Sequence, residues 1–562
     1  MDYKGKESLI QLAGLLAAKE VSVAVISPGS RNAPVIAALN RQQGIQCVSV
    51  VDERSAAFFA LGIAQQTRKP VAISCTSGTA ALNYAPAIAE AYYQQIPLIV
   101  LTADRPPEWI DQGDGQTIRQ QNLYANYIRK SVQLPSEPLD RNALRYNARL
   151  INEAIDAATF PVSGPVHINI PLSEPLYEEN DKHSTPLAVI EAVNAFPQIS
   201  SDAYQQLAYQ WNGAGSKLMI TGLLSPEPAL NSLLNRLAED ETVAVFTETT
   251  SNLSGHFFFP HIDRLIDGIE QESQGKFTPD LLITFGGHIV SRKVKAWLQK
   301  QKPKAHWHIA ADGFHMDTFR SLTHTIPMKP ADFFSHFIQK TEPARGNYRQ
   351  LWLDHQETRT QKHSAYIRQC KWSDLKAFQI ILEHMPGGSM IQAGNSTPVR
   401  YLQLFDPPAN TNCFGNRGVS GIDGCTSTAA GAAWANPALT VLITGDVAFL
   451  YDSNALWNPN LSPNLRIIVM NNGGGNIFRI IEGPDTLPEL ENFIETPYIP
   501  QIQHMANMFG LDYYAVSDES GLRTCLPLFL DKNIRKPAIL EVKTQNKTSA
   551  AVLREYFKFL RS

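Results

Sequence analysis

Two short polar segments in the C-terminal third of the chain, Gly445-Asp446 and Asn471-Asn472, have the residue types of a cation site. Each follows an apolar run, at 440–444 and 465–470, with helix-compatible residues between the two runs. This is the pattern of a βαβ unit, and open parallel sheets bind ligands beyond the carboxyl ends of their strands. A carboxylate, an amide oxygen and glycine carbonyls are ligands that Mg²⁺ or Ca²⁺ prefers. The pattern fits either a cation site that is shared with phosphate or two ordinary strand-terminal turns.

The N-terminal part of the chain also places polar loops after apolar runs. Strand-like runs at 21–26, 45–51, 71–75 and 98–101 end in the segments SPGSRNAP, DERS, TSGTA and TADRPPE, and a further run covers 166–170. Strand-like runs that alternate with helical segments predict a parallel sheet with helices on both faces. The four loops then share one rim, where we expect a site.

Three charged residues on this rim could do chemistry. Glu53 stands directly after one run and before the helical segment AAFFALGIA, where a carboxylate is commonly only a partner of the helix dipole. Arg31 and Arg105 could form surface salt bridges. On one rim they could also clamp a carboxylate, because a guanidinium matches a carboxylate in bidentate geometry.

The elements that must position these residues indicate three domains. The chain has 562 residues, which is longer than a chain that folds around a single hydrophobic core normally is. Further strand-like runs lie at 217–221, 243–246, 281–285 and 305–309, and a third set extends from 389–393 to 538–542. We expect α/β domains, each a doubly wound parallel sheet, at 1–180, 181–345 and 346–562, with a connector at 346–374. The three blocks look like a triplicated architecture.

Bulk composition excludes several classes of protein. Hydrophobic residues make up 44% of the chain, charged residues 18%, and the net charge is −4, so no basic excess points to nucleic acid. No apolar run is long enough for a membrane span. The segment LIQLAGLLAA near the N-terminus indicates a surface helix and not a signal peptide. Six scattered cysteines without metal-ligand spacing fit a cytoplasmic protein better than a zinc site or disulfides.

Gly445-Asp446 followed by Asn471-Asn472, together with the strand-end Glu53, resembles the signature of thiamine diphosphate enzymes. A wider set of eight motifs closely resembles that of the 2-succinyl-5-enolpyruvyl-6-hydroxy-3-cyclohexene-1-carboxylate synthases (MenD) of menaquinone biosynthesis. The motifs are SPGSR at 27–31, DERS at 52–55, TSGTA at 76–80, LTADRPPE at 101–108, QTIRQ at 116–120, GNS at 394–396, NRGVSGIDG at 416–424 and NNGGGNIF at 471–478. The resemblance covers both outer domains and is weak in the middle one. It implies a pyrimidine-binding first domain and a diphosphate-binding third domain.

The resemblance implies a cofactor and residues that hold it. Asp446, Asn472 and the Gly474 carbonyl would bind Mg²⁺, or Mn²⁺, which bridges to the cofactor's diphosphate beside Gly445. Glu53 would be catalytic through a hydrogen bond to the aminopyrimidine N1′ of thiamine diphosphate. Ile422 would be the apolar wedge that bends the cofactor, although alone it fits a core isoleucine equally well. The remaining implied cofactor contacts are Gln116, Asn395, Ser396 and Phe478.

The implied activity is that of a transferase. It decarboxylates 2-oxoglutarate and adds the resulting succinyl carbanion to isochorismate. Because the remaining carboxylates of both substrates are anions, several fixed cations are needed. The donor would bind Arg400 and Arg417, with Ser396 nearby, and isochorismate would bind Ser30, Arg31 and Arg105. Where the family has a substrate-binding lysine in the middle domain, this chain has Arg292 followed by Lys293, and either could supply the charge.

Family members place the site between subunits, so a homodimer or homotetramer is expected. One alternative is a thiamine diphosphate decarboxylase or carboligase of the acetolactate synthase type, which would not need so many arginines. Another is a binding protein without catalysis, against which Glu53 argues because binding alone needs no N1′ partner.

Overall fold

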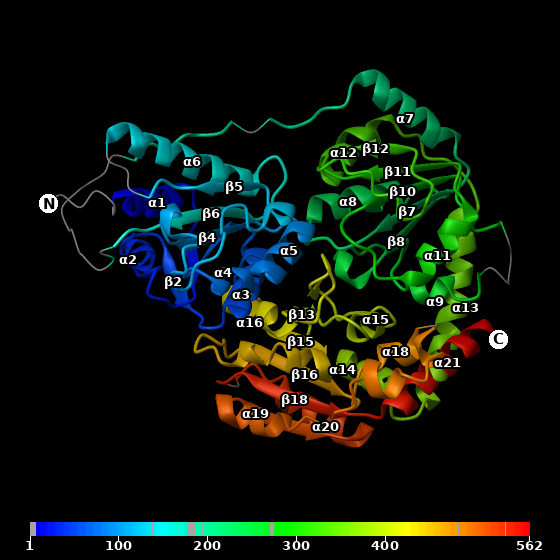
Figure 1. Cartoon of the computed structure of the whole chain (residues 1–562). Coiled ribbons are helices and arrows are strands. Elements are labelled where there is room, and N and C mark those ends of the chain that lie inside the picture. Colours follow the sequence, from blue (N-terminus) through cyan, green and yellow to red (C-terminus); the bar gives the residue numbers. More distant parts are fainter. Residues whose placement is uncertain are drawn as a thin grey trace.

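The computed structural model describes residues 7–136, 140–174, 176, 187–193, 195–269, 275–481, 483–498, 500–533 and 535–562. This part of the chain forms three six-stranded parallel sheets, one after another in sequence (Figure 1). The α/β fold class with three parallel-sheet domains is therefore confirmed. The boundaries at residues 180 and 345 fall between sheets and stay predictions. In the part of the chain described, no helix combines the length and apolarity needed to cross a membrane.

The first sheet lies in the blue and cyan part of Figure 1. Its strands are, in spatial order, β2 (Gln46–Ser49), β1 (Val23–Ile26), β3 (Val71–Cys75), β4 (Leu98–Asp104), β6 (Val166–Pro171) and β5 (Lys130–Gln133). Its helices are α1 (Glu7–Ala18), α2 (Ala33–Arg41), α3 (Glu53–Thr67), α4 (Thr79–Asn83), α5 (Ala85–Gln94) and α6 (Arg141–Thr159). The strand order reverses between β1 and β3, which is where a doubly wound sheet opens a crevice.

The middle sheet has a different strand order. Its strands are β12 (His324–Ile326), β11 (Ala305–Ile309), β10 (Leu281–Phe285), β7 (Lys217–Thr221), β8 (Val243–Thr247) and β9 (Phe258–Phe259). Its helices are α7 (Ser201–Gly213), α8 (Pro228–Leu237), α9 (Ile262–Ile266), α11 (Arg292–Gln301) and α12 (Pro330–Phe337). This is the strand order of dinucleotide-binding folds. The expectation of a triplicated architecture is therefore wrong in detail, because only the outer two sheets share one topology.

The third sheet repeats the strand order of the first. The long helix α13 (Tyr348–Gln369) leads into it from the middle sheet. Its strands are β14 (Asn412–Phe414), β13 (Met390–Ala393), β15 (Thr440–Gly445), β16 (Leu465–Asn471), β18 (Ala538–Lys543) and β17 (Asp512–Val516). Its helices are α14 (Asp374–His384), α15 (Pro398–Leu402), α16 (Cys425–Ala435), α17 (Asp446–Tyr451), α18 (Ile477–Ile480), α19 (Ile502–Phe509), α20 (Glu519–Phe529) and α21 (Asn546–Arg561).

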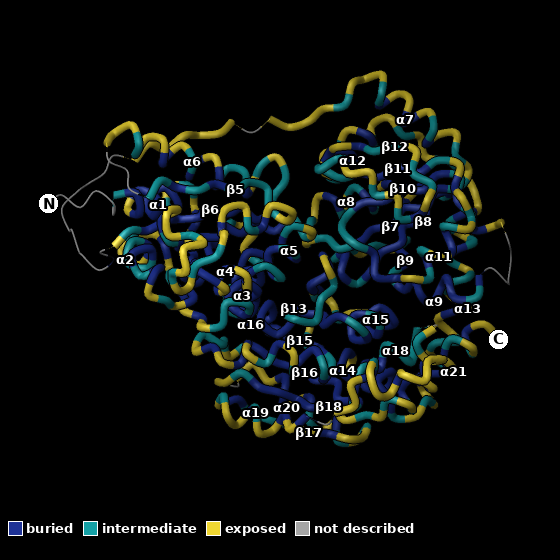
Figure 2. The backbone as a smooth tube through the Cα atoms, in the orientation of Figure 1, coloured by how far each residue is buried: buried dark blue, intermediate teal, exposed yellow. Residues whose placement is uncertain are grey.

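Both faces of each sheet are buried, as the dark central strands in Figure 2 show. Successive strand residues point to opposite faces, so Val441 packs into one apolar cluster and Leu442 into another. The cluster that contains Leu442 also contains Val25 and Phe58 of the first domain. The first and third domains therefore share one hydrophobic core.

Helices α3 and α16 cross closely within this shared core. A Cβ added to Gly62 would lie 2.1 Å from the Thr428 carbonyl oxygen, and a Cβ added to Gly431 would lie 1.9 Å from that of Phe59. Only glycine allows the two backbones to approach this far. The crossing fixes α3, whose first residue is Glu53, against the third domain.

Candidate active site

Asp446 lies at the carboxyl end of β15, where it begins the short helix α17. Its carboxylate is buried and accepts hydrogen bonds from the backbone N–H groups of Val447 at 2.8 Å and of Gly473 and Gly474 at 3.0 Å each. Burial raises the pKa of Asp446 to about 6, against the lowering effect of these hydrogen bonds. The loop after β16 thus closes onto Asp446.

Asn472 brings a second oxygen to this place. Its amide Nδ2 donates to Asp374 at 2.9 Å, while its Oδ1 is buried and has no hydrogen-bond donor among the residues described. A buried carbonyl oxygen without a partner is costly unless an ion or water satisfies it. A hard divalent cation fits this donor set, because it prefers carboxylate and amide oxygens. In the described chain no three His, Cys, Asp or Glu residues gather as a metal site, so the fit depends on amide and backbone oxygens.

Gly474 completes the turn that aligns these oxygens. Its φ is 143°, and an added Cβ would lie 2.8 Å from the Glu495 carbonyl oxygen. A side chain is therefore excluded at this position. The Gly475 N–H donates to the same Glu495 carbonyl at 2.6 Å, and the ring of Phe478 packs close to Gly475.

Glu53 is the first residue of α3 and is half-buried. Burial raises the pKa of its carboxyl group, and the neighbouring Asp52 charge raises it further. Its flanking residues are tied to the third domain: Asn454 donates to Asp52 at 2.9 Å, and Arg54 donates to the Tyr451 carbonyl at 2.7 Å. The backbone of Glu53 is thus fixed, while no described side chain donates a hydrogen bond to its carboxylate.

Arg417 and Arg400 form a cluster of cations at the third sheet. Arg417 is buried and donates to Asn395 Oδ1 at 2.9 Å, and Arg400 donates to the Val290 carbonyl at 3.4 Å. The Nε of each guanidinium is buried without a partner in the described part of the protein. Asn395 also donates to the carbonyls of Asn416 at 2.7 Å and Gly421 at 2.6 Å, so it braces the loop that contains the half-buried Ile422.

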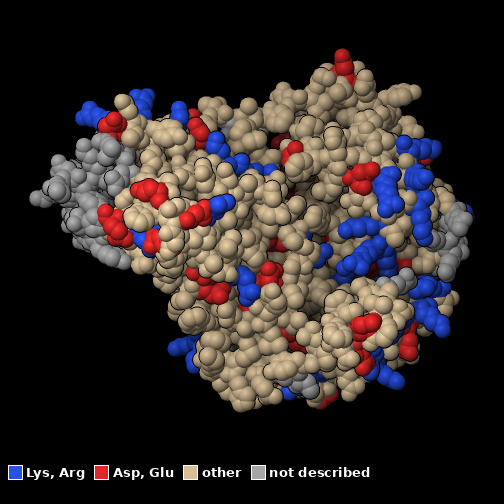
Figure 3. Space-filling view, in the orientation of Figure 1, with Lys and Arg blue, Asp and Glu red and all other residues tan. Residues whose placement is uncertain are grey.

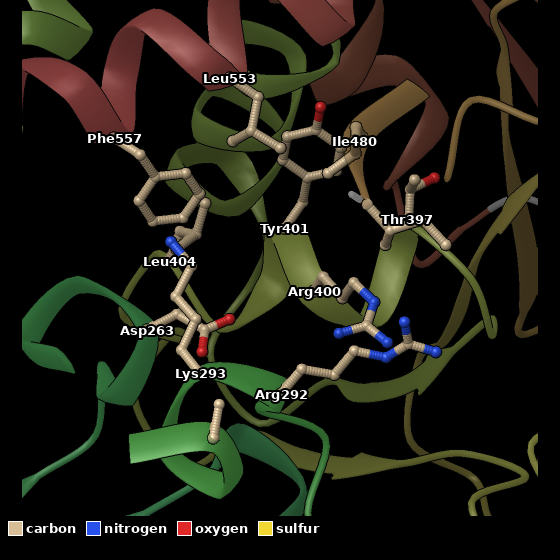
Figure 4. Close-up of a pocket in the computed structure, with 12 residues that line it drawn as sticks. Asp263, Arg292, Lys293, Thr397, Arg400, Tyr401, Leu404, Ile480, Leu553 and Phe557 are labelled. Carbon is tan, nitrogen blue, oxygen red and sulfur yellow. The ribbon is translucent and has the colours of Figure 1, made fainter. Parts of the chain in front are cut away.

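A cavity of about 440 Å³ opens beside this cluster. Figure 4 shows the guanidinium groups of Arg292 and Arg400 side by side at its edge. Lys293 points the other way, where its ammonium lies 3.0 Å from the ring centroid of Phe557 and pairs with Asp267. Of the two middle-domain candidates, Arg292 is therefore the one whose charge faces Arg400.

A further cation, Lys295, lies in the same cluster and was missed from the sequence. Burial lowers its pKa, Glu248 opposes this, and the positive charges of Arg417, Arg400 and Arg292 lower the pKa further. Spacing of three residues on α11 places Arg292 and Lys295 on one helix face, a signal that could have revealed it. Figure 3 shows lysine and arginine side chains gathered over this part of the surface.

Glu248, also missed from the sequence, is buried opposite these cations. It accepts hydrogen bonds from the N–H groups of Val290, at 2.8 Å, and Ser291, at 2.8 Å, which precede α11. Burial raises its pKa to about 7.

Arg31 and Arg105 form a second, separate cluster on the first sheet. Arg31 is buried and lies 3.0 Å from Glu174 Oε1, and Arg105 lies 3.7 Å from the same oxygen. Arg105 also pairs with Asp114 at 2.9 Å. The two guanidinium groups thus converge on one carboxylate, as the clamp hypothesis requires. The adjacent Ser30 is exposed.

Two further predicted contacts have unusual backbones. Gln116 has φ 56° and Ser396 has φ 76°, a region that non-glycine residues rarely adopt. Gln116 is exposed, and its backbone packs against Gly78 of the TSGTA loop. Such strain is concentrated at functional sites, which favours a functional role for both residues.

Comparison with known proteins gives the family. The model of the thiamine pyrophosphate enzyme N-terminal TPP-binding domain matches residues 10–123. A 2-succinyl-5-enolpyruvyl-6-hydroxy-3-cyclohexene-1-carboxylate synthase of Flavobacterium psychrophilum is 45% identical over 95% of this chain and 96% of the relative. The synthase of Flavobacterium johnsoniae is 41% identical over 99% and 98%, and that of Porphyromonas gingivalis 38% identical over 100% and 98%. The chain is a thiamine diphosphate-dependent enzyme, and it belongs to the 2-succinyl-5-enolpyruvyl-6-hydroxy-3-cyclohexene-1-carboxylate synthase family.

Proposed function

We propose that this protein decarboxylates 2-oxoglutarate and transfers the succinyl group to isochorismate, releasing CO₂. The observation that carries the proposal is the pair of buried oxygens at the ends of adjacent strands, Asp446 and Asn472 Oδ1. Together they fit the cation of a thiamine diphosphate enzyme. The arginine clusters fit two anionic substrates.

We infer that Asp446, Asn472 Oδ1 and the Gly474 carbonyl hold Mg²⁺ or Mn²⁺ beside the diphosphate, next to Gly445. Positive charge is needed there because the diphosphate is an anion. When bound, thiamine diphosphate supplies the nucleophilic carbon and the electron sink of the reaction.

Glu53 is the proposed acid–base residue. With the cofactor bound, its carboxyl group would hydrogen-bond N1′ of the aminopyrimidine, and burial raises the pKa of this carboxyl group. Ile422 would be the apolar wedge against the cofactor, and Phe478 would line its pocket. Gln116 and Ser396 contact the cofactor or substrate, and Asn395 keeps Arg417 and the Ile422 loop in register.

Each of the two arginine clusters binds one of the two substrates. Arg400 and Arg417, joined by Arg292, bind the distal carboxylate of 2-oxoglutarate, because their Nε atoms are buried and still lack partners. Ser30, Arg31 and Arg105 bind a carboxylate of isochorismate in the place that Glu174 takes here. Lys293 is held by Asp267 and Phe557, so it contributes charge from a distance.

We further propose a homodimer, or a homotetramer built from it, with each site between subunits. The support for this proposal is the resemblance to the family, whose members place the site between subunits. Mixing inactive Glu53→Gln and Asp446→Ala proteins should then restore activity through mixed dimers. No restoration after verified subunit exchange would contradict this arrangement. The six free thiols support the predicted cytoplasmic location.

The activity is tested by incubating the protein with thiamine diphosphate, Mg²⁺, 2-oxoglutarate and isochorismate. We expect release of CO₂ together with loss of isochorismate absorbance. Neither change should occur when one of the two substrates is left out. Turnover of pyruvate but not of 2-oxoglutarate would instead identify a carboligase of the acetolactate synthase type. Binding of thiamine diphosphate without any turnover would identify a binding protein.

A further inference from the structure

Asp374 is a buried carboxylate directly behind the candidate cation site. It begins α14, far from Asp446 in sequence. Its Oδ2 accepts from the amides of Asn472 at 2.9 Å and Asn476 at 3.2 Å. Its Oδ1 accepts from the hydroxyls of Ser549, at 3.1 Å, and Thr544.

These contacts determine which way the Asn472 amide points. An ionised carboxylate only accepts hydrogen bonds, so the –NH₂ group of Asn472 must face Asp374. The carbonyl oxygen then faces the opposite side, where it is buried without a donor in the described protein. Asn476 is arranged in the same way, with its amide on Asp374 and its Oδ1 unpartnered.

We propose that Asp374 is a positioning residue of the cation site, which holds Asn472 Oδ1 toward the ion and adds a second negative charge behind it. The inference depends on the proposed role of Asn472 as a ligand. Groups that orient a metal's ligands commonly contribute a factor of 10 to 100 in metal affinity. The charge of Asp374 is felt at the site, because it raises the pKa of Asp446.

The neighbouring residue offers a matched control. Asn471 donates its amide to Glu541, another buried carboxylate of the same sheet, which also accepts from the Tyr513 hydroxyl. Glu541→Gln therefore removes a buried charge that orients Asn471, the residue next to Asn472 in the sequence. It leaves Asn472 and Asp374 untouched.

The test measures Mg²⁺ affinity by calorimetric titration of the full-length protein with thiamine diphosphate present. We expect Asp374→Asn, which keeps the size but loses the charge, to weaken Mg²⁺ binding about 10-fold. Asp374→Ala should weaken it by a factor of about 10 to 100, because the amide of Asn472 can then turn. Glu541→Gln should stay within about 3-fold of the wild type, well below that range. Thermal unfolding without Mg²⁺ checks that each variant is folded.

A double-mutant cycle separates positioning from general stability. If Asp374 orients Asn472, then Asp374→Ala should weaken Mg²⁺ binding less in the Asn472→Ala background than in the wild type, because only the charge of Asp374 is then lost. Unchanged affinity in Asp374→Asn, an equal loss in Glu541→Gln, or additive losses in the cycle would each overturn the inference while leaving the proposed function intact. Failure of the wild type to bind Mg²⁺ with thiamine diphosphate would refute the cation site itself.

Discussion

Arg417 donates to Asn395 Oδ1 at 2.9 Å, and this single contact joins a substrate-binding candidate to the loop after β13. The amide of Asn395 is fully used, because it also donates to two carbonyls of the 416–424 loop. The guanidinium is thus held at one end while its buried Nε has no described partner. That Nε is the donor left available to a substrate carboxylate.

Removing Arg417 should weaken the binding of 2-oxoglutarate selectively. We expect Arg417→Ala to raise the KM for 2-oxoglutarate by a factor of about 10 to 100, since a charge-assisted contact contributes about 1.5–3 kcal/mol. The KM for isochorismate should change little. Arg523→Ala is the control, because that arginine forms exposed pairs with Glu383 and Glu519 elsewhere on the domain. Equal effects on both substrates would contradict the assignment.

Substitutions of Arg31 and of Glu174 should change the KM for isochorismate in opposite directions. Arg31→Ala removes half of the clamp and should raise the KM for isochorismate at least about 10-fold. Glu174→Gln removes the carboxylate that competes for the clamp, so that KM should fall. Steady-state kinetics with isochorismate as the varied substrate measures both. A rise of KM in both variants would mean that Glu174 supports the site and does not compete with substrate.

Glu90 should prove necessary for the stability of the Arg417 loop. It is buried in the first domain and accepts from the N–H groups of Gly418 at 2.5 Å and Val419 at 2.7 Å. Glu90→Ala leaves two backbone donors unsatisfied and should destabilise the protein by about 1–3 kcal/mol. Denaturant midpoints measure the loss. Gln94→Ala, which removes only a donor to Glu90 and to the Gly415 carbonyl, should cost less.

Glu248 should make stability depend on pH. Burial raises its pKa in the folded protein to about 7, from about 4.5 in the unfolded chain, so the folded protein binds more protons between these two pH values. Its contribution is complete below about pH 4.5 and is lost as the pH rises through 7. Relative to the wild type, Glu248→Gln should therefore gain up to about 1.4 kcal/mol per pH unit across this window. Denaturation midpoints at several pH values test this, and a pH-independent difference would contradict it.

The sequence predicted all the central strands but only one edge strand, β2. The runs at 71–75, 217–221, 281–285 and 305–309 coincide with β3, β7, β10 and β11. The strands missed were β5, β9, β12, β14 and β17, and each lies at the edge of its sheet. β5 (KSVQ) and β17 (DYYAV) are only partly buried, so they lack the continuous apolar run of a central strand, whereas β9 is buried but has only two residues.

The sequence predicted the site residues that lie at strand ends. It did not predict the residues that reach the site only through the packing of distant elements. Asp446 and Asn472 follow apolar runs of the third sheet, and Glu53 follows one of the first sheet, so parallel-sheet topology predicts them at the carboxyl ends of their strands. Asp374 and Glu248 reach the site from other elements, and nothing in their local sequence indicates the buried amides that they accept from. The pairing of Arg31 and Arg105 on one oxygen likewise depends on Glu174, distant in sequence.

The most direct test of the central claim is the Glu53→Gln variant, assayed for turnover and for thiamine diphosphate affinity in parallel. Glutamine keeps the size of the side chain but cannot exchange the proton at N1′. We predict a loss of turnover of about 10²–10⁴-fold, as for a removed acid–base group, with cofactor affinity changed less than about 10-fold. Turnover close to that of the wild type would contradict the account.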